Sequence, residues 1–373
     1  MEIVNATPML VNYTLGMDPE GRERVVVVVK GTFQLPKDGG ALKLADEQAE
    51  PILADESYGE PGMSAVKYES EFAAVKPRCD VLVNGSAYTP RGVPAHRVTV
   101  GLRSPTFEKT FDVVGAREWD HILFSDAITD PVPFTQLPLH YGVAYGGSDP
   151  IPGREGELDT FAENPVGQGY YPRRSGFDII GLPLPNTEET GRPVADRGGA
   201  YRPMAFSTLS RNIPQRIAHA GTYNQDWIDN HFPFLPRDFD PLYYQCAPSD
   251  QQIDHPRGGE PFGLFNLTPE GWTTFQLPSL DLAIEFTNAA YQRTEVPAVV
   301  DTVVIEPDLQ RVLLLWRASY PLKRNMLEMR QAVVGRMPRG WYRARDLGKT
   351  YYSSLGRLVQ SKEAERGNDE VTA

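Results

Sequence analysis

Carboxylates and one histidine gather between residues 238 and 255, in the stretch best supplied with groups that bind a cation or move a proton. These residues are Asp238, Asp240, Asp250, Asp254 and His255. Calcium takes several carboxylate and carbonyl oxygens, so a hard-cation site is one interpretation. The spacing fits no loop template such as the EF-hand, and aspartates beside prolines commonly cap turns. We therefore expect turn caps here, with no metal and no cofactor.

Two pairs of acids would suit glycoside hydrolysis, namely Asp226 with Asp238 and Asp254 with Glu260. That reaction needs two carboxyl groups roughly 5–9.5 Å apart across a cleft. The aromatic side chains available to stack on sugar rings are those of Trp227, Tyr243 and Tyr244. An acidic chain offers many such pairs, and the sequence does not set the distance between them. A carbohydrate-binding or glycoside-processing protein is therefore the alternative to the non-catalytic hypothesis below.

Nucleophilic catalysis has one candidate dyad, Cys246 with either His219 or His255. The chain contains neither a G-x-S-x-G elbow nor a phosphate-cradling G-x-x-x-x-G-K-[ST] loop. A lone cysteine between Gln245 and Ala247 is more often a small buried hydrophobe. We therefore predict that the protein is not an enzyme.

Aromatic side chains are dense between Arg211 and Glu260, where frequent prolines forbid a long helix or a central strand. Large aromatics normally bury themselves, so most of this group is expected in the core. Tyrosine and tryptophan also dominate binding surfaces, so part of it is expected to contact a partner. The residues that we assign to partner binding here are Trp227, Phe239, Asp240, Tyr243 and Tyr244.

A basic segment closes the chain. Residues 322–357 hold nine lysines and arginines against two acids, whereas the whole chain has a net charge of −12. This asymmetry is typical of an interaction segment, and equally of a basic segment folded back on an acidic body. Apolar residues at helical spacing predict a helix over residues 322–334. The residues that we assign to partner binding in this segment are Met326, Met329, Arg336, Arg339 and Arg343.

Strand patterns at the two ends of the chain must position these groups. Residues 1–120 are predicted to form an N-terminal antiparallel β unit, in which the run Val25–Val29 is covered on both faces. Asn84-Gly85 is the strongest hairpin signal. Residues 271–321 are predicted to form C-terminal strands, at Trp272–Leu277, Asp281–Phe286, Val299–Glu306 and Arg311–Ser319.

The periodicity fades between the two ends, where prolines and glycines accumulate among aromatic residues. We expect residues 121–270 to form a loop-rich layer packed on the sheets. The predicted fold is mainly β, with two antiparallel, sandwich-like sheet units and a long ordered loop layer between them. Residues 322–373 are predicted to be a basic, partly helical extension beyond the core, ending in a disordered tail.

Composition limits the possible partners. A net charge of −12 and a pI near 5.1 argue against nucleic acid or an anionic membrane. The two cysteines are too few for a disulfide scaffold or a cysteine zinc site. The N-terminus has no basic region followed by an apolar region, and no apolar run is long enough to span a membrane. We therefore expect a cytoplasmic protein.

Several motifs in a fixed order resemble the domain-of-unknown-function family 2169, over about Asn5 to Leu280. They include Lys76-Pro77-Arg78-x-Asp80, Tyr145-Gly146-Gly147, Glu163-Asn164-Pro165-Val166-Gly167, Arg216-x-x-x-Ala220-Gly221-Thr222-Tyr223-x-x-x-Trp227, Leu235-Pro236-x-Asp238-Phe239-Asp240 and Ala247-Pro248-x-Asp250-Gln251-Gln252. Cys79 departs from the pattern, which usually has a small polar residue such as threonine there. The chain beyond Leu322 lies outside the resemblance.

The resemblance implies a bacterial protein that accompanies type VI secretion spike genes. Some members of the family act as adaptors or chaperones that load a toxic effector onto the spike (VgrG/PAAR) complex. The implied partners are thus an effector protein and a spike protein. The family carries no established catalytic residues that would transfer to this chain.

Overall fold

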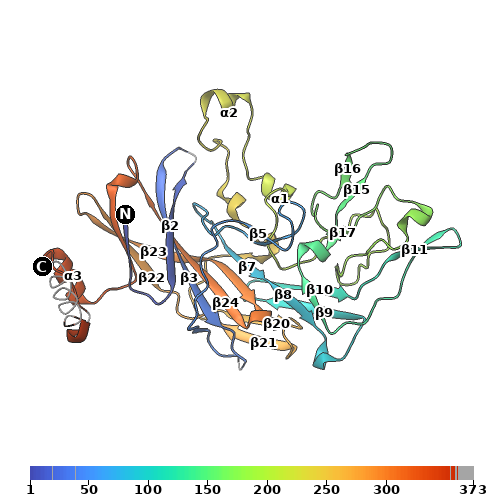
Figure 1. Ribbon diagram of the computed structural model, residues 1–373, viewed down its shortest axis with the longest axis horizontal. Coiled ribbons are helices and arrows are strands. Elements are labelled where there is room, and N and C mark those ends of the chain that lie inside the picture. Colours follow the sequence, from blue (N-terminus) through green and yellow to red (C-terminus); the bar gives the residue numbers. More distant parts are fainter. Residues whose placement is uncertain (19, 38, 353, 358, 360–373) are drawn as a thin grey trace, which may run out of the picture.

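A computed structural model describes residues 1–18, 20–37, 39–352, 354–357 and 359 (Figure 1). It confirms the predicted mainly β fold. The larger sheet has ten strands, seven of which follow one another in the order β1 (Glu2–Asn5), β25 (Met329–Val334), β22 (Leu282–Asn288), β23 (Arg293–Glu306), β24 (Arg311–Pro321), β3 (Glu23–Gln34) and β2 (Leu10–Met17). The others are β7 (Cys79–Val83), which runs parallel to β23, β19 (Gln252–Ile253) and β4 (Lys43–Leu44).

The second sheet has five strands, in the order β18 (Thr187–Glu188), β10 (Glu108–Val114), β9 (Arg97–Arg103), β20 (Pro261–Phe265) and β21 (Trp272–Gln276). One apolar cluster joins the two sheets. It contains Val27 and Leu314 from the larger sheet, together with Val100, Phe111 and Phe262 from the smaller one. Burial of this shared cluster holds the sheets together, since apolar area removed from water is the main stabilising contribution to folding.

The run Val25–Val29 lies in the middle of β3, between β2 and β24, and all five side chains are fully buried. Alternate valines face opposite sides of the sheet. Val25, Val27 and Val29 enter the cluster that joins the sheets, whereas Val26 and Val28 pack with Leu315 and Phe72 on the other face. The prediction that this strand is covered on both faces is confirmed.

The two ends of the chain do not form separate sheets, which corrects the predicted division into an N-terminal and a C-terminal β unit. Strand β3 pairs with β24, β7 pairs with β23, and β9 pairs with β20. Each of these pairs joins residues from the first third of the chain to residues from its last third. Local patterns predict that a strand exists, but its partner depends on packing across the whole molecule.

Asn84-Gly85 does not form a hairpin turn. Strand β7 ends at Val83, and β8 (Gly85–Tyr88) pairs instead with β13 (Gln136–Leu139). A Cβ atom at residue 85 would lie 2.9 Å from Cδ of Pro307, so the glycine allows close packing on the turn between β23 and β24.

Residues 322–334 are not a helix. A single 3-10 turn, η7 (Met326–Glu328), precedes β25, which lies between β1 and β22 in the larger sheet. Met329 and Val334 are buried in the cluster that joins the sheets. Pairing on both sides and the β-branched Val333-Val334 favour a strand over the helical spacing that the sequence also contains. The helix of this region comes later, as α3 (Arg339–Asp346). The predicted disordered tail lies mostly outside the described residues.

The middle of the chain contains short ladders and single-turn helices joined by loops. The ladders pair β11 (Trp119–Ile122) with β12 (Ser125–Ile128), β14 (Tyr145–Gly146) with β17 (Gln168–Gly169), and β15 (Ser148–Pro150) with β16 (Leu158–Thr160). The helices are η2 (Tyr141–Val143), η3 (Gly176–Ile179), α1 (Pro214–Ile217), α2 (Gln225–Asn230), η4 (Pro241–Tyr244) and η5 (Ser249–Gln251). Elsewhere lie β5 (Glu56–Ser57), β6 (Val66–Tyr68), η1 (Pro90–Gly92) and η6 (Pro307–Leu309). Within the described residues, no helix has both the length and the apolar composition needed to cross a membrane.

Candidate functional site

An arm formed by residues 218–238 projects from the body of the protein and carries α2 at its tip (Figure 1). Asn224 caps α2 by accepting a hydrogen bond from the backbone N–H of Trp227 (3.0 Å). The two limbs of the arm are joined by Asp238, whose carboxylate accepts from the backbone N–H of Thr222 (3.0 Å) and from its hydroxyl (2.7 Å). These bonds give an irregular segment one defined conformation.

Gly221 and Phe234 fix the arm further. Gly221 has φ +80°, and a Cβ atom there would lie 2.8 Å from Cβ of Pro236, so the crossing of the limbs requires glycine. The indole N–H of Trp227 donates to the carbonyl oxygen of Phe234 (2.9 Å). The ring of Phe234 lies against Gly21 in the turn between β2 and β3, where an added Cβ atom would be 2.9 Å from the ring.

The outer surface of the arm is apolar. Its large exposed side chains, with their exposed fractions, are Tyr223 (54%), Ile228 (55%), Phe232 (67%) and Phe234 (44%). The half-buried Trp227 packs edge-on between Tyr223 and Phe232, with ring centroids 4.8 and 5.6 Å apart. Apolar side chains grouped on one projecting element are typical of interaction sites.

The foot of the arm is formed by residues 214–217 and 239–244, which flank the arm in the sequence, and Arg216 is buried there. The guanidinium donates to the Glu69 carboxylate (2.7 and 2.9 Å) and to the carbonyl oxygens of Leu209 (3.0 Å) and Tyr243 (2.8 Å). This planar fork ties the start of the arm to its end and to the loop that carries Glu69.

The other residues that we assigned to this region lie at the foot rather than on the outer surface. Phe239 is buried, and the half-buried rings of Tyr243 and Tyr244 pack on it at 5.9 and 5.4 Å. Asp240 caps η4 by accepting from the backbone N–H of Leu242 (2.9 Å), and it also contacts Nδ1 of His219 (2.9 Å). These contacts position the arm. The exposed residues Ile228, Phe232 and Phe234 were missed, although aromatics separated by prolines were a usable signal.

Asp80, from the Lys76-Pro77-Arg78-x-Asp80 motif, anchors the segment that follows the foot. Its buried carboxylate accepts from Lys76 Nζ (2.7 Å), Gln245 Nε2 (2.8 Å) and the backbone N–H groups of Cys246 (2.9 Å) and Ala247 (3.1 Å). Burial alone would raise the pKa of Asp80. The Lys76 ammonium and the backbone donors outweigh burial and hold that pKa below its usual value.

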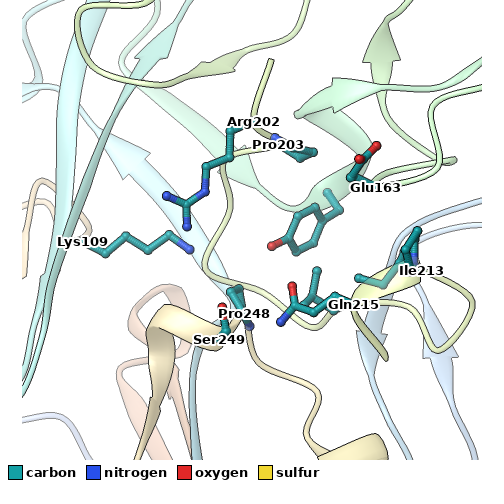
Figure 2. Close-up of a pocket in the computed structure, with 11 residues that line it drawn as sticks. Lys109, Glu163, Arg202, Pro203, Ile213, Gln215, Pro248 and Ser249 are labelled. Carbon is teal, nitrogen blue, oxygen red and sulfur yellow. The ribbon is translucent and has the colours of Figure 1, made fainter. Parts of the chain in front are cut away.

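A pocket of about 160 Å³ lies beside the foot of the arm (Figure 2). Its polar end holds Lys109 from β10 and Arg202, which share the carboxylate of Asp250. Lys109 Nζ lies 3.2 Å from Asp250 Oδ1, and Arg202 Nη2 lies 2.6 Å from Asp250 Oδ2. Lys109 Nζ also donates to Oε1 of Gln251 (2.6 Å). Burial lowers the pKa of Lys109 to about 8, although the Asp250 carboxylate acts in the opposite direction.

Tyr141 from η2 lines the same pocket and is 6% exposed. Burial raises the pKa of its hydroxyl, Asp250 raises it further and Arg202 lowers it, so the phenol oxygen lies within electrostatic reach of both charges. Leu209, Ile213 and Pro248 are buried side chains of the apolar wall. The pocket thus combines two cations, a phenol and an apolar surface. Its lining comes from segments far apart in the sequence, and no local pattern pointed to it.

The candidate cation ligands make separate contacts and do not converge on one site. Asp238 joins the limbs of the arm, Asp240 caps η4 and Asp250 forms ion pairs with two cations, whereas the Asp254 side chain is 96% exposed. His255 Nε2 lies 3.1 Å from the carbonyl oxygen of Lys76. No group of three or more His, Cys, Asp or Glu residues that could hold a metal occurs in the part of the chain that the structure describes.

The acid pairs and the thiol dyad do not assemble at the pocket. Asp226 lies on α2 and accepts from Asn230 (2.7 Å), and Glu260 accepts from the backbone N–H of Arg257 (2.7 Å). The Cys246 thiol lies 3.3 Å from Oδ2 of Asp80, and burial raises its pKa. Neither His219 nor His255 makes a hydrogen bond to that thiol.

Of the residues that we assigned in the C-terminal segment, Met329 is in the core and Met326 is half-buried, whereas Arg336, Arg339 and Arg343 are exposed. Helix α3 is attached to the larger sheet by ion pairs from Arg345 to Glu285 (3.0 Å) and from Arg293 to Asp346 (2.5 Å). The basic segment is therefore partly folded back on the body, while Arg336, Arg339 and Arg343 face solvent.

Comparison with known proteins identifies one family. The family described as "Uncharacterized protein conserved in bacteria (DUF2169)" matches residues 20–317, a range that contains the arm, its foot and the pocket. No curated protein and no solved structure matches the chain.

Proposed function

The chain belongs to the DUF2169 family of proteins conserved in bacteria, and from this premise we propose that it is a non-catalytic adaptor or chaperone. It binds an effector protein of a type VI secretion system in the cytoplasm and helps to load that effector onto the spike. The role comes from the resemblance described above, and the arm supplies the surface on which the effector docks.

The observation that carries this proposal is an apolar surface on a projecting element of defined conformation. Tyr223, Ile228 and Phe232 are each more than half exposed, while hydrogen bonds within the arm hold its backbone. A preorganised loop loses little conformational entropy on binding. Large apolar and aromatic side chains supply most of the binding free energy at protein interfaces.

The motif that carries the resemblance is also the one that builds the arm. Arg216 ties its foot, Gly221 permits its limbs to cross, Thr222 joins them through Asp238, and Trp227 closes the tip. The same residue types therefore account both for the family resemblance and for the shape of the proposed docking surface. We expect the arm to cover apolar surface of the effector until the effector reaches the spike.

The second contact, with the spike, is assigned to Arg336, Arg339 and Arg343. These exposed arginines lie in or just before α3. Their charge is opposite to that of the chain as a whole, so they favour an acidic rim on the partner. Replacing all three with glutamate should slow association with the spike more than it speeds dissociation, because peripheral charges act mainly on the encounter.

The experiment compares three single variants of the full chain: Ile228→Ala, Phe232→Ala and the control Leu309→Ala. Leu309 matches Ile228 in exposure (57% and 55%) but lies on η6, between β23 and β24. The co-purifying effector is identified, purified and titrated against each protein. Each arm variant should weaken binding about 10-fold or more, as expected for truncating an interfacial anchor. The control should bind within about twofold of the unaltered protein, and thermal unfolding should confirm that all three fold.

Equal affinity of the arm variants and the control would refute the role of the arm. Identification of a partner that is neither a secreted effector nor a spike component would refute the adaptor function. Turnover of glycosides by the pure protein, abolished by Asp226→Asn or Asp238→Asn, would favour the carbohydrate alternative instead.

A further inference from the structure

The pocket beside the foot of the arm has the charge pattern of an anion site. Lys109 and Arg202 share the single carboxylate of Asp250, which leaves one positive charge in excess at this end. Figure 2 shows the Lys109 and Arg202 side chains approaching each other on one side of the pocket, while Glu163 lies on the other side with its carboxylate directed away from Lys109. A monovalent anion therefore fits the polar end better than a divalent one.

Lys109 is the buried member of this pair, with a side chain 6% exposed. Its lowered pKa, about 8, shows that Asp250 does not fully offset the burial of the ammonium. A second anion beside the ammonium would favour the charged form. The site is thus more stable when it is occupied by a negative group.

Tyr141 is the second indication of a ligand. Its side chain is buried in the pocket lining, and its hydroxyl makes no hydrogen bond to any residue that the structure describes. A phenol hydroxyl that lines a pocket and has no protein partner is free to exchange a hydrogen bond with a water molecule or a ligand there. Because Asp250 and Arg202 both act on its pKa, this hydroxyl belongs to the same polar end of the pocket.

Size and wall composition restrict the ligand further. The volume, about 160 Å³, is well below the roughly 300–1,000 Å³ of pockets for drug-sized molecules. An apolar cavity of about 150 Å³ accommodates one benzene molecule. The wall of Leu209, Ile213 and Pro248 therefore has room for a single apolar side chain next to the anion.

We propose that the pocket binds the C-terminal residue of a partner polypeptide, with the terminal carboxylate at Arg202, Tyr141 and Lys109 and an apolar side chain against the wall. The inference rests on the proposed adaptor function and names the part of the partner that the protein recognises. Ile213, Pro214 and Gln215 line the pocket at the start of α1, and the chain continues from α1 directly into the arm. One partner can thus contact the arm with its surface and the pocket with its terminus.

The test uses the full chain with N-acetyl-leucine as the probe, and N-acetyl-leucinamide and inorganic phosphate as comparison ligands. Binding is followed by ligand-observed NMR titration. N-acetyl-leucine should bind with a millimolar Kd, and the amide, which lacks the charge, should bind at least about 10-fold more weakly, as expected for loss of a hydrogen bond between charged groups.

Three variants locate the site. Arg202→Gln should weaken N-acetyl-leucine binding about 10-fold, and Tyr141→Phe, which keeps the ring and removes only the hydroxyl, should weaken it several-fold. Arg154→Gln is the control, because Arg154 is an exposed arginine paired with Glu157 and does not line the pocket. Thermal unfolding checks that each variant is folded. Equal binding of the amide, binding of phosphate in place of N-acetyl-leucine, or an unchanged Kd in both pocket variants would each overturn the inference.

The proposals for the pocket and for the arm can be tested independently of each other. Phe232→Ala should lose affinity for the intact partner and keep its affinity for N-acetyl-leucine. A partner shortened by its last three residues should bind the unaltered protein and Arg202→Gln with equal, reduced affinity. If the shortened partner binds as tightly as the intact one, the inference about the terminal residue is wrong, but docking on the arm is not contradicted. If arm variants bind the partner normally and N-acetyl-leucine still binds at the pocket, the adaptor proposal is wrong, but carboxylate binding at the pocket is not contradicted.

Discussion

Asp80 and Lys109 are both buried in charged surroundings, yet their pKa shifts have different consequences. Asp80 is held below its usual pKa by Lys76 and backbone N–H donors, so its charged form stabilises the fold. Lys109 has a lowered pKa, so its charged form is less stable in the folded protein than in water. The first belongs to the structural support of the arm, and the second belongs to the pocket.

Asp80→Asn should lower the free energy of unfolding by roughly 3–5 kcal/mol, because it leaves the buried Lys76 ammonium without its counter-ion. Asp254→Asn, which changes an exposed carboxylate, is the control and should have an effect within about 0.5 kcal/mol. Urea unfolding measures both. Since the pKa of Asp80 is below its ordinary value of 3.8, the advantage of the unaltered protein should persist down to that pH and disappear only at lower pH. Similar effects of the two substitutions would contradict this role.

The lowered pKa of Lys109 predicts that the free energy of unfolding changes with pH in the alkaline range. The unfolded chain keeps the proton up to about its ordinary pKa of 10.5, whereas the folded protein releases it near pH 8. Between these values the unfolded state binds more protons, so raising the pH favours folding. The difference in unfolding free energy between the unaltered protein and Lys109→Gln should therefore rise from pH 8 to 10.5, by up to about 3 kcal/mol. Urea unfolding at a series of pH values measures it, and a flat difference would show that Lys109 titrates normally.

Among the elements, β25 and the hairpin of β11 and β12 both depart from the local preference of their sequences. β25 lies between β1 and β22, so it belongs to the larger sheet although its sequence has helical spacing. The hairpin ends in a two-residue loop, Leu123 and Phe124, with φ of +48° and +72°. Both residues are almost fully exposed, and glycine or asparagine is usual in such turns.

Truncation after Pro321 should prevent cooperative folding, because it removes β25 and leaves β1 and the buried side chains of β22 without their neighbour. Truncation after Met337 keeps every strand that the structure describes and removes α3, none of whose residues is buried. This second protein should unfold cooperatively, with a Tm close to that of the full chain. Thermal unfolding followed by circular dichroism distinguishes the two, and cooperative unfolding of the shorter protein would show that β25 is dispensable.

Replacing Leu123-Phe124 with Asn-Gly should stabilise the fold. The two-residue loop requires positive φ at both positions, where bulky side chains are strained by about 1–2 kcal/mol each and glycine is not. Their exposure means that few packing contacts are lost. The expected result is an increase of about 1–2 kcal/mol in the free energy of unfolding, measured with urea. A decrease would mean that contacts of Leu123 or Phe124 outweigh the backbone strain.

For the whole molecule, aspartates satisfied by protein donors predict a fold that does not depend on metal. Asp238, Asp240 and Asp250 each accept hydrogen bonds or ion pairs from neighbouring residues. Addition of a chelator should therefore leave the Tm unchanged, and calcium should leave it unchanged as well. Differential scanning calorimetry is the measurement. A reproducible calcium-dependent increase of several degrees would reveal a site for that ion, because a ligand that binds only the folded state raises its stability.

Several strand positions and the capping role of Asp240 could be predicted from the sequence. The run Val25–Val29 and the strands beginning near Trp272 and Arg311 were placed within a few residues, because β-branched residues and period-two alternation act locally. Asp240 was predicted to cap a turn beside a proline, and it caps η4. These features depend on neighbouring residues, so one stretch of sequence contains the information.

The pairing of the strands, the exposed surface of the arm and the pocket were decided by the tertiary structure. β3 with β24, and β25 with both β1 and β22, are contacts between distant segments, and many registers satisfy the same alternation. Aromatic residues of one short stretch divide between the foot, where Phe239 is buried, and the outer surface, where Phe232 is exposed. Composition cannot make that distinction. The pocket brings together Lys109, Tyr141, Arg202 and Ile213, whose proximity follows only from how the loops pack on the sheets.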